Sequence, residues 1–402
     1  MLKRRKEMKE AIQRMIRARQ GDTLHMYSQW LAIPHELIAE ANPHVSNELH
    51  DGEIIQIPGY DVVAYHSQTS ETLEQIACSA SLPTEVLQRM NDDRLPLRIP
   101  RRIEATLVNG QKPYDFASMK QDIDDLCTHY PFIKQKVIGT SVLGQPIIEL
   151  TIGCGPKKIH LNGSFHANEW ITTAAIMSFI NEYVLALTNG NVLFGHTLMD
   201  YYKKVTLSIV PMVNPDGVDL VLNGPPNQEP YRSEVLRINQ GERDFSQWKA
   251  NIRGVDLNNQ FPAKWEIEQA RKIPKSPAPR DFPGFSPLTE PEAKAMADLA
   301  YNRDFEIIVA FHTQGKEIYW GYEGWEPEDA EPIVNALAKA SGYQAVRYID
   351  SHAGYRDWFI QEWKRPGYTV ELGEGVNPLP LEQFGQIKEH ALKMLLSLLA
   401  IS

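Results

Sequence analysis

Polar side chains able to do chemistry follow short apolar runs at three places in the chain. In residues 161–170, His166 and Glu169 stand three positions apart, after a predicted strand and before a predicted helix. An imidazole and a carboxylate at that spacing can converge on one cation if the intervening turn is tight. The spacing alone is a weak signal, because residues 50–53 (His-Asp-Gly-Glu) share it in a turn to which we assign no chemistry.

The second place is the end of the apolar run 307–311, which is followed by His312. A single histidine there is more often a structural residue with satisfied hydrogen bonds. Two histidines and one carboxylate, however, form a three-ligand set that leaves the fourth position of zinc open for water, as in catalytic sites. Residues His166, Glu169 and His312 are therefore a candidate catalytic zinc site.

The third place is Glu371, at the end of the run 368–370. A carboxylate near a zinc-bound water can take its proton and pass it to a leaving amine. Glu374, in the glycine-rich loop that follows, is the competing candidate. Ligands gather beyond the carboxyl ends of parallel strands, which is where all these residues are expected to lie.

The elements that must position these residues alternate between strand and helix after residue 110. Strands are predicted at 147–152, 158–162, 205–210, 307–311 and 368–371, and helices at 172–187, 291–301 and 382–399. Thr289 and Glu292 form a capping-box signal before the second helix. Residues 220–290, rich in Pro, Gly and Asn, are expected to be a long irregular stretch. The alternation predicts an α/β domain with a mostly parallel sheet.

Residues 110–402 resemble the M14 family of zinc metallocarboxypeptidases. The resemblance rests on His166 and Glu169, on the motifs at 213–217 (Val-Asn-Pro-Asp-Gly) and 254–258 (Gly-Val-Asp-Leu-Asn), and on His312 and Glu371. It implies a zinc carboxypeptidase-like α/β domain whose mostly parallel, mixed sheet is flanked by helices. It also implies one Zn²⁺ per chain, held by the two histidines and Glu169, with Glu371 as general base and acid. Such a zinc lowers the pKa of water towards roughly 7 and polarises the scissile carbonyl.

The sequence departs from the family pattern at two cationic positions. The family has an arginine after the position of Asn258, where this chain has Asn259. An asparagine cannot supply the forked positive charge that grips a C-terminal carboxylate. Nine residues before Asn258, where the family has an arginine that polarises the scissile carbonyl, stands Lys249, with Arg253 as the alternative cation. Asn258 itself is expected to orient the substrate.

The resemblance assigns two further residues to substrate binding. In the family a tyrosine ahead of the Gly-x-x-Asp-Trp pattern, here residues 354–358, covers the site. Tyr348 is the candidate, although the exact register falls on Ile349. Arg356 stands where the family sets side-chain specificity, and a cation there favours an acidic group on the leaving residue.

An internal repeat precedes this domain. Residues 22–24 (Asp-Thr-Leu) recur as 71–73 (Glu-Thr-Leu), and Asn42 recurs as Asn91, both at an offset of 49 residues. Each unit predicts a strand, a helix, a helix that starts near a proline, a turn and a strand. The sequence therefore predicts two small βααβ domains, at 18–60 and 61–104. Each is too small to bury much core alone, so we expect them to pack against each other or against the rest of the chain.

The first repeat resembles a LysM domain, and the second is a degenerate copy with Ser70 in place of Gly21. LysM domains bind glycans that contain N-acetylglucosamine, including peptidoglycan, between two loops. The resemblance implies glycan-binding residues in those loops, namely Gly21, Asp22, Thr23, Asn42 and Pro43. The alternative for either repeat is a spacer that has lost glycan binding.

The combination of LysM-like repeats with an M14-like domain resembles the bacterial γ-D-glutamyl-L-diamino acid endopeptidases. It implies hydrolysis of the γ-D-glutamyl–meso-diaminopimelate bond in peptidoglycan or muropeptides, where the extra carboxylate of diaminopimelate would suit Arg356. The alternatives are a zinc carboxypeptidase, a zinc deacylase of N-acyl amino acids, and a non-catalytic peptidoglycan-binding protein.

The composition of the chain excludes several other classes of protein. A chain of 402 residues with 43% hydrophobic and 23% charged residues is typical of a globular protein. Its net charge of −10 argues against a nucleic-acid partner. No unbroken apolar run of about 18 residues predicts a membrane span. Three cysteines form no disulfide framework. The oligomeric state stays open.

The basic start of the chain contrasts with this acidic balance. Residues 1–19 carry eight Lys or Arg and two Glu. A secretory signal needs an apolar segment next, and arginines interrupt it here. We therefore expect residues 1–17 to be a basic, solvated leader helix, and the enzyme to be cytoplasmic or associated with the spore.

Overall fold

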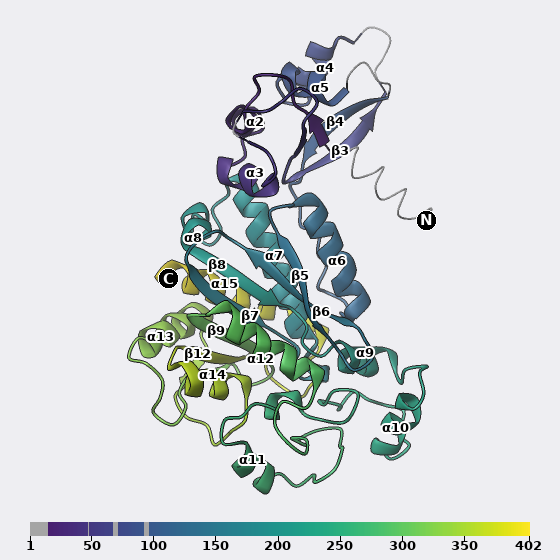
Figure 1. The fold of residues 1–402 in the computed structure, drawn as a ribbon, viewed down its shortest axis with the longest axis vertical. Helices are drawn as coiled ribbons and strands as arrows, with labels where there is room; N and C mark the ends of the chain where they lie inside the picture. Colours follow the sequence, from purple (N-terminus) through teal and green to yellow (C-terminus); the bar gives the residue numbers. More distant parts are fainter. Residues whose placement is uncertain (1–14, 47, 67–70, 92–95) are drawn as a thin grey trace. The chain divides into compact units, whose positions relative to one another are not determined.

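The structure is a computed structural model that describes residues 15–46, 48–66, 71–91 and 96–402. The chain forms two compact units (Figure 1). The smaller comprises Met1–Leu107, Asp122–Lys134 and Asn181–Leu198, and the larger comprises Val108–Gln121, Gln135–Ile180 and Met199–Ser402.

The larger unit is built on an eight-stranded sheet with the order β11-β10-β12-β9-β7-β8-β6-β5. Strands β12, β9, β7 and β8 run parallel to one another, and β11 runs parallel to β10, whereas β10 is antiparallel to β12 and β6 is antiparallel to β8. This mixed, mostly parallel sheet confirms the predicted fold class. The strands are β5 (Lys134–Thr140), β6 (Pro146–Ile152), β7 (Lys157–Asn162), β8 (Val205–Val210), β9 (Ile307–His312), β10 (Glu317–Tyr319), β11 (Gln344–Val346) and β12 (Gly367–Glu371).

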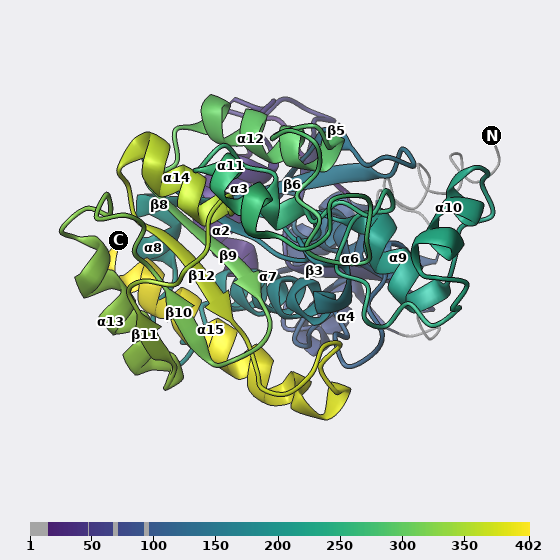
Figure 2. The same ribbon diagram turned by 90° about the horizontal axis from the view of Figure 1, so that it is seen from below.

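Helices cover both faces of the sheet (Figures 1 and 2). Helices α12 (Pro291–Arg303) and α14 (Tyr355–Trp363) lie on one face; α7 (Ile171–Asn189), α13 (Ala330–Ser341) and α15 (Phe384–Ile401) lie on the other. Every residue of β9 is consequently buried, as expected for a parallel strand between two helical layers. The remaining helices are α6 (Phe116–His129), α8 (Met199–Lys204), α9 (Pro215–Asn223), α10 (Tyr231–Ile238) and α11 (Trp265–Arg271), with short 3₁₀ turns at Ala167–Glu169, Leu257–Asn259 and Leu381–Gln383.

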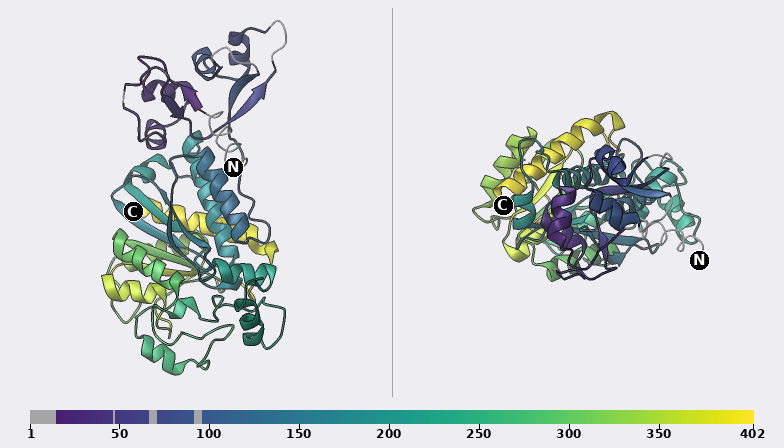
Figure 3. Two further views of the ribbon diagram at one scale, coloured as in Figure 1. Left: turned by 45° about the vertical axis from the view of Figure 1, so that its right-hand side comes forward. Right: turned by 90° about the horizontal axis from the view of Figure 1, so that it is seen from above.

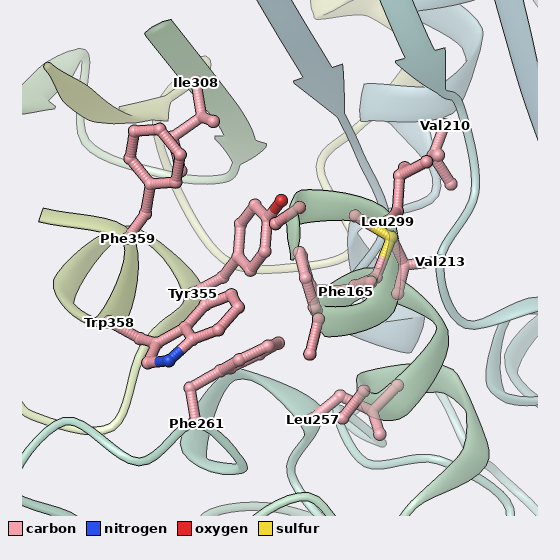
Figure 4. Packing of buried hydrophobic residues seen from close by; sticks show 14 of the residues in the cluster. Phe165, Val210, Val213, Leu257, Phe261, Leu299, Ile308, Tyr355, Trp358 and Phe359 are labelled. Carbon is pink, nitrogen blue, oxygen red and sulfur yellow. The ribbon is translucent and has the colours of Figure 1, made fainter. Parts of the chain in front are cut away.

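An aromatic cluster fills the core between the sheet and the α12–α14 layer (Figure 4). Phe165, at its centre, lies 5.5 Å from the ring of Tyr355 and 6.0 Å from that of Phe261. Phe261 in turn lies 5.3 Å from Trp358. Because Phe165 immediately precedes His166, the packing of this cluster fixes the start of the loop that carries the chemistry.

Two expectations for this unit are wrong in detail. No capping box precedes α12: Glu290 is the N-cap without a side-chain cap, and the Thr289 hydroxyl bonds Gln260 Oε1 at 3.0 Å. Glu292 is buried and accepts from the Val142 backbone N–H at 3.1 Å.

The stretch 220–290 is not wholly irregular, since it holds α10, α11 and a 3₁₀ turn. These helices are too short for their apolar periodicity to stand out.

Segment Ala167–Asn189 is long and apolar enough to cross a membrane, with a mean hydropathy of 1.3. The structure buries 89% of that window, and a core helix passes the same test. Thr, Ser and Asn interrupt its apolar residues, which is why the sequence shows no unbroken run. The segment is therefore weak evidence for a membrane span.

The smaller unit contains the two predicted βααβ repeats (purple and blue in Figure 3). The outer strands pair antiparallel in each repeat. Strand β1 begins at Met15, so residues 15–17 are a strand and not part of a leader helix; residues 1–14 lie outside the described residues. The first repeat has β1 (Met15–Arg17), α2 (Leu24–Leu31), α3 (His35–Ala41) and β2 (Ile54–Gln56), and the second has β3 (Tyr60–Tyr65), α4 (Leu73–Ser79), α5 (Thr84–Asn91) and β4 (Leu97–Arg102).

The repeated asparagines have the same structural role in both repeats. Asn42 donates to the Ile38 and Gln56 carbonyls and accepts from the Gln56 N–H, each at 2.8 Å. Asn91 makes the equivalent three bonds, with the Leu87 carbonyl and the backbone of Arg98. Each asparagine thus joins the end of the second helix to the last strand, which explains its recurrence at one offset.

The structure uses three of the five predicted glycan-binding residues internally. Asp22 is buried, and Arg89 of the second repeat binds it at 2.7 Å. Asn42 is buried as described above, and the Thr23 hydroxyl caps α2 by accepting from Met26 N–H. The Asp22 and Asn42 side chains are therefore not available to a glycan. Gly21 and Pro43 are exposed.

Candidate active site

The three predicted ligands converge at the carboxyl ends of β7 and β9. His166 Nδ1 lies 2.9 Å from Glu169 Oε1, and His312 Nδ1 lies 3.0 Å from Glu169 Oε2. The two Nδ1 atoms are 3.2 Å apart. All three side chains are buried. The 3₁₀ turn Ala167–Glu169 supplies the tight turn that the spacing of His166 and Glu169 requires.

This donor set fits a zinc ion. Ligand atoms of a tetrahedral ion at about 2.0–2.1 Å lie about 3.3 Å from each other, close to the observed separations. Two imidazoles and one carboxylate are also ligands that zinc accepts. His166 Nε2 lies 3.3 Å from Asp256 Oδ1, the outer carboxylate contact that orients a zinc-binding histidine. The cluster could hold the metal without rearrangement.

The electrostatics of the cluster favour a cation. Burial alone would lower the pKa of His166, but the carboxylates of Glu169 and Asp256 raise that pKa to about 9. Burial alone would raise the pKa of Glu169 and of Asp256, yet both pKa values lie well below their usual range. His166 and His312 lower the pKa of Glu169, and His166 with Lys249 lowers that of Asp256. The carboxylates are therefore charged, and their negative potential at the two Nδ1 atoms attracts a divalent ion.

Two residues that the sequence did not reveal orient Glu169. Asn377 Nδ2 donates to Glu169 Oε1 at 3.3 Å and to the Thr313 carbonyl at 2.9 Å. The Thr313 backbone N–H donates to Glu169 Oε2 at 3.3 Å. Asn377 follows β12 in a loop without motif, so no pattern could have pointed to it. Asp256, by contrast, lies in the motif at 254–258, which was the available signal for its role.

Glu371 ends β12 and pairs with His312 in the register of β12 with β9. Its side chain lines a cavity of about 310 Å³ together with Glu169 and Lys249. Burial, and next the charge of Glu169, raise the pKa of Glu371 to about 8. Glu374 is exposed and pairs with Lys316 at 3.3 Å. The structure therefore places Glu371, and not Glu374, beside the ligand cluster.

Lys249 is fixed beside the ligands by backbone hydrogen bonds. Its carbonyl accepts from the Ala167 N–H at 3.0 Å, one residue after His166. Its positive charge opposes the rise in the pKa of Glu371. Arg253, the alternative cation, has an exposed side chain that lies 3.5 Å from Glu290 and does not line the cavity. Of the two candidates, the structure brings only Lys249 to the site.

The motif at 213–217 connects the two loops that carry these groups. Asn214 caps α9, where its Oδ1 accepts from the Gly217 N–H at 3.1 Å. Its Nδ2 donates to the carbonyls of Phe165 and Ala250, at 3.2 and 3.1 Å. Asn214 therefore holds the loop of His166 and the loop of Lys249 together.

The remaining predicted substrate-binding residues, Asn258, Asn259 and Arg356, make contacts within the protein and lie outside the cavity. Asn258 Oδ1 accepts from the Tyr355 N–H at 3.2 Å, and Asn259 Nδ2 donates to the Asn258 carbonyl. Arg356 is buried on α14 and ion-paired with Asp357. It is not the exposed loop arginine that a chance match would give. None of these three side chains lines the 310 Å³ cavity.

Tyr348 does not cover the site. Its hydroxyl donates to Glu326 at 2.9 Å and its ring is half exposed, whereas the next residue, Ile349, lines the cavity. The prediction of Tyr348 is wrong because the loop register falls one residue later. The tyrosine in the cavity wall is Tyr319 of β10, which no motif marks. Arg280 and Gln247 also line the cavity and were missed.

Comparisons with known proteins agree with this geometry. The family model described as zinc carboxypeptidase matches residues 119–393. The chain is 48% identical over 388 residues to "Gamma-D-glutamyl-L-diamino acid endopeptidase 1" of Lysinibacillus sphaericus, covering 94% of this chain and 98% of that protein. It is 24% identical to human carboxypeptidase B, over 79% of this chain and 77% of that one.

A solved structure supports the fold. The crystal structure of thrombin activatable fibrinolysis inhibitor superposes with a TM-score of 0.59 at 19% identity, covering 73% of this chain and 75% of that one. This match shows the carboxypeptidase-like α/β fold alone. With the family model and the His-Glu-His cluster, it leads to one conclusion: the chain belongs to the M14 family of zinc carboxypeptidases and is a zinc-dependent peptidase.

Proposed function

We propose that this enzyme hydrolyses the γ-D-glutamyl–meso-diaminopimelate bond of peptidoglycan peptides. The observation that carries the proposal is the 48% identity, over 98% of its length, to a relative named as a γ-D-glutamyl-L-diamino acid endopeptidase. An identity that spans nearly the whole of both chains includes the N-terminal repeats as well as the peptidase domain.

The residue at position 259 supports an endopeptidase over a carboxypeptidase. A carboxypeptidase must bind a free terminal carboxylate, for which a forked guanidinium is well suited. Asn259 offers a neutral amide, and its Nδ2 already donates to the Asn258 carbonyl at 3.2 Å. A substrate whose chain continues past the cleaved bond therefore loses little at this position.

In the proposed reaction Glu371 moves the protons. A zinc ion held by His166, Glu169 and His312 would lower the pKa of water and polarise the scissile carbonyl. Glu371 takes a proton from the attacking water and then gives it to the amine of the departing diaminopimelate. Burial raises its pKa, which favours the protonated form that donates to the departing amine.

Lys249 and Arg356 are proposed to receive the negative charges of the reaction and the substrate. Lys249 faces the cavity beside Glu371 and would stabilise the oxyanion that develops on the carbonyl. Arg356, whose guanidinium lies 5.9 Å from the Tyr319 ring, would favour an acidic group on the leaving residue. Asn258 would orient that residue.

We further propose that the N-terminal repeats bind glycan through their exposed loops, including Gly21 and Pro43, and that the enzyme acts on wall peptides in the cytoplasm or at the spore. Co-sedimentation of the full chain with insoluble peptidoglycan tests the first part. N-acetylglucosamine oligomers should release the protein from the pellet. Release at an equal concentration of an unrelated oligosaccharide would argue against glycan recognition.

The endopeptidase assignment is tested with two forms of one substrate. L-Ala-γ-D-Glu-diaminopimelyl-D-Ala and its C-terminal amide should be cleaved with kcat/KM values within a few-fold. A zinc carboxypeptidase needs the terminal carboxylate and would lose most activity on the amide. A deacylase would prefer a single N-acyl amino acid to either peptide.

A further inference from the structure

A cation that no motif marks lines the same cavity as the catalytic groups. Arg280 lies in the cavity wall with Lys249, Glu371 and Tyr319. Its side chain is 52% exposed, and its Nε lies 3.2 Å from the adjacent Asp281. Within residues 15–46, 48–66, 71–91 and 96–402, no other carboxylate lies within ion-pair distance of Arg280. Its two terminal nitrogens thus remain available to a ligand.

Backbone hydrogen bonds hold Arg280 in this position. The Pro279 carbonyl accepts from the N–H groups of Lys249 and Ala250, at 2.8 and 3.0 Å. On the other side, the Asp281 N–H donates to Asp256 Oδ2 at 3.3 Å. Arg280 is therefore tethered on both sides to the segment that carries Lys249 and the carboxylate partner of His166. Its place beside the reacting groups is built into the fold.

The other cationic side chains near the site, Arg356 and Lys249, already have assigned partners or roles. Arg356 is buried, is ion-paired with Asp357 and is assigned above to the leaving residue. Lys249 is assigned to the oxyanion. The side chains assigned to the leaving residue, Asn258, Asn259 and Arg356, do not line this cavity. We assign the cavity of Arg280 to the acyl side of the scissile bond, because the side chains assigned to the leaving residue lie outside it.

On that side a γ-linked D-glutamate differs from an ordinary peptide residue. Its γ-carbonyl is the scissile one, so its α-carboxylate remains free a few bonds away. A guanidinium binds such a carboxylate through two parallel hydrogen bonds. We propose that Arg280 binds the free α-carboxylate of the γ-linked glutamyl residue and so selects γ-glutamyl over α-linked and amidated substrates. This inference rests on the proposed function.

The test compares L-Ala-γ-D-Glu-diaminopimelate with the same peptide carrying an α-carboxamide on the glutamyl residue. The unmodified enzyme should prefer the carboxylate by roughly 10- to 100-fold in kcat/KM, as expected for a charged hydrogen-bond pair. In Arg280→Ala, kcat/KM should fall for the peptide with the free α-carboxylate and not for the carboxamide. The ratio of the two kcat/KM values should therefore come close to one. Arg280→Glu should reverse the preference, and Arg280→Lys should keep part of it.

Lys275→Ala is the matched control. Lys275 is an exposed cation of the same loop, donates to the Gln269 and Ala270 carbonyls and does not line the cavity. Its loss should leave the ratio unchanged. Equal losses on both substrates in Arg280→Ala, or a preserved ratio, would overturn the proposal. So would a changed preference for amidation of diaminopimelate instead, which would place Arg280 on the leaving side.

A binding measurement separates this inference from the proposed function. Calorimetry compares the dipeptide L-Ala-γ-D-Glu with its α-carboxamide as ligands of the zinc-loaded enzyme and of Arg280→Ala. A preference for the carboxylate that Arg280→Ala removes supports the inference even if cleavage occurs at another bond. Equal affinities in the unmodified enzyme contradict it, whichever bond is cut.

Discussion

Glu371 lies directly opposite His312 in the parallel pairing of β12 with β9. Opposed residues of adjacent strands project to the same side of a sheet, so this register puts a carboxylate next to a metal ligand. The loop between β7 and α7 brings His166 and Glu169 to the same edge. One sheet edge therefore assembles the metal ligands and the proton carrier from three distant segments.

Glu371→Gln should abolish turnover without loss of zinc. The amide keeps the size of the side chain but cannot carry a proton, and general acid–base groups contribute roughly 10²- to 10⁴-fold to rates. Turnover of a γ-D-glutamyl-diaminopimelyl peptide and zinc content by atomic absorption are the two readouts. Loss of zinc together with activity, or retained activity, would contradict the assignment.

Asp256→Ala should weaken zinc binding by about 10- to 100-fold, because it removes the carboxylate that orients His166. Competition with a chelator of known affinity measures this change. Asp304→Ala is the matched control: Asp304 is an exposed carboxylate paired with Arg365, and it precedes the end of β9 opposite to His312. An Asp256→Ala protein that folds and binds zinc as tightly as the control would refute the role of Asp256.

Lys249→Ala should lower kcat by about 10²- to 10³-fold, as loss of an oxyanion-stabilising group does elsewhere. Lys249→Arg should recover part of the rate, since it restores the charge. Steady-state kinetics on one substrate decide between the two cations that the sequence left open. The assignment fails if Arg253→Ala, and not Lys249→Ala, shows this loss in kcat.

The ion pair between the repeats should make stability depend on pH. Burial would raise the pKa of Asp22, but hydrogen bonds from Arg89, the Arg19 N–H and Tyr27 lower that pKa from 3.8 to about 2. A depressed carboxyl pKa stabilises the fold above pH 3.8, and this contribution of about 2 kcal/mol is lost as pH falls through 2.

Denaturant unfolding of the full chain and of Asp22→Asn measures this effect. The difference in the free energy of unfolding between the two proteins should be largest above pH 5 and should shrink towards pH 2. A difference that stays constant over this range would mean that the Asp22 carboxyl titrates normally in the folded protein.

The sequence could predict the five contiguous strands from β12 to β6 and the metal ligands, because both are local signals, whereas β5, β10 and β11 were missed. Buried parallel strands are short apolar runs, and His166, Glu169, His312 and Glu371 each follow one of them. The repeat was visible for a similar reason, since Asn42 and its counterpart make the same backbone bonds.

The rest depends on contacts between segments that are far apart in the chain. Arg280 is placed by the hydrogen bonds that the Pro279 carbonyl accepts from the 249–250 backbone and that the Asp281 N–H donates to Asp256, and no motif records them. Counting from the Gly-x-x-Asp-Trp pattern gave Ile349, which lines the cavity, whereas Tyr348 was chosen for its residue type and lies outside the cavity wall. Asp22 matched a loop pattern, but its burial depends on Arg89, 67 residues away.

Mass spectrometry of the products of L-Ala-γ-D-Glu-diaminopimelyl-D-Ala, formed by the zinc-loaded enzyme and by enzyme treated with a chelator, decides whether this protein is a zinc-dependent γ-D-glutamyl endopeptidase. The zinc-loaded enzyme should release L-Ala-γ-D-Glu and diaminopimelyl-D-Ala, and the chelator should abolish cleavage. Release of D-Ala alone, or cleavage that persists after the zinc has been removed, would contradict this assignment.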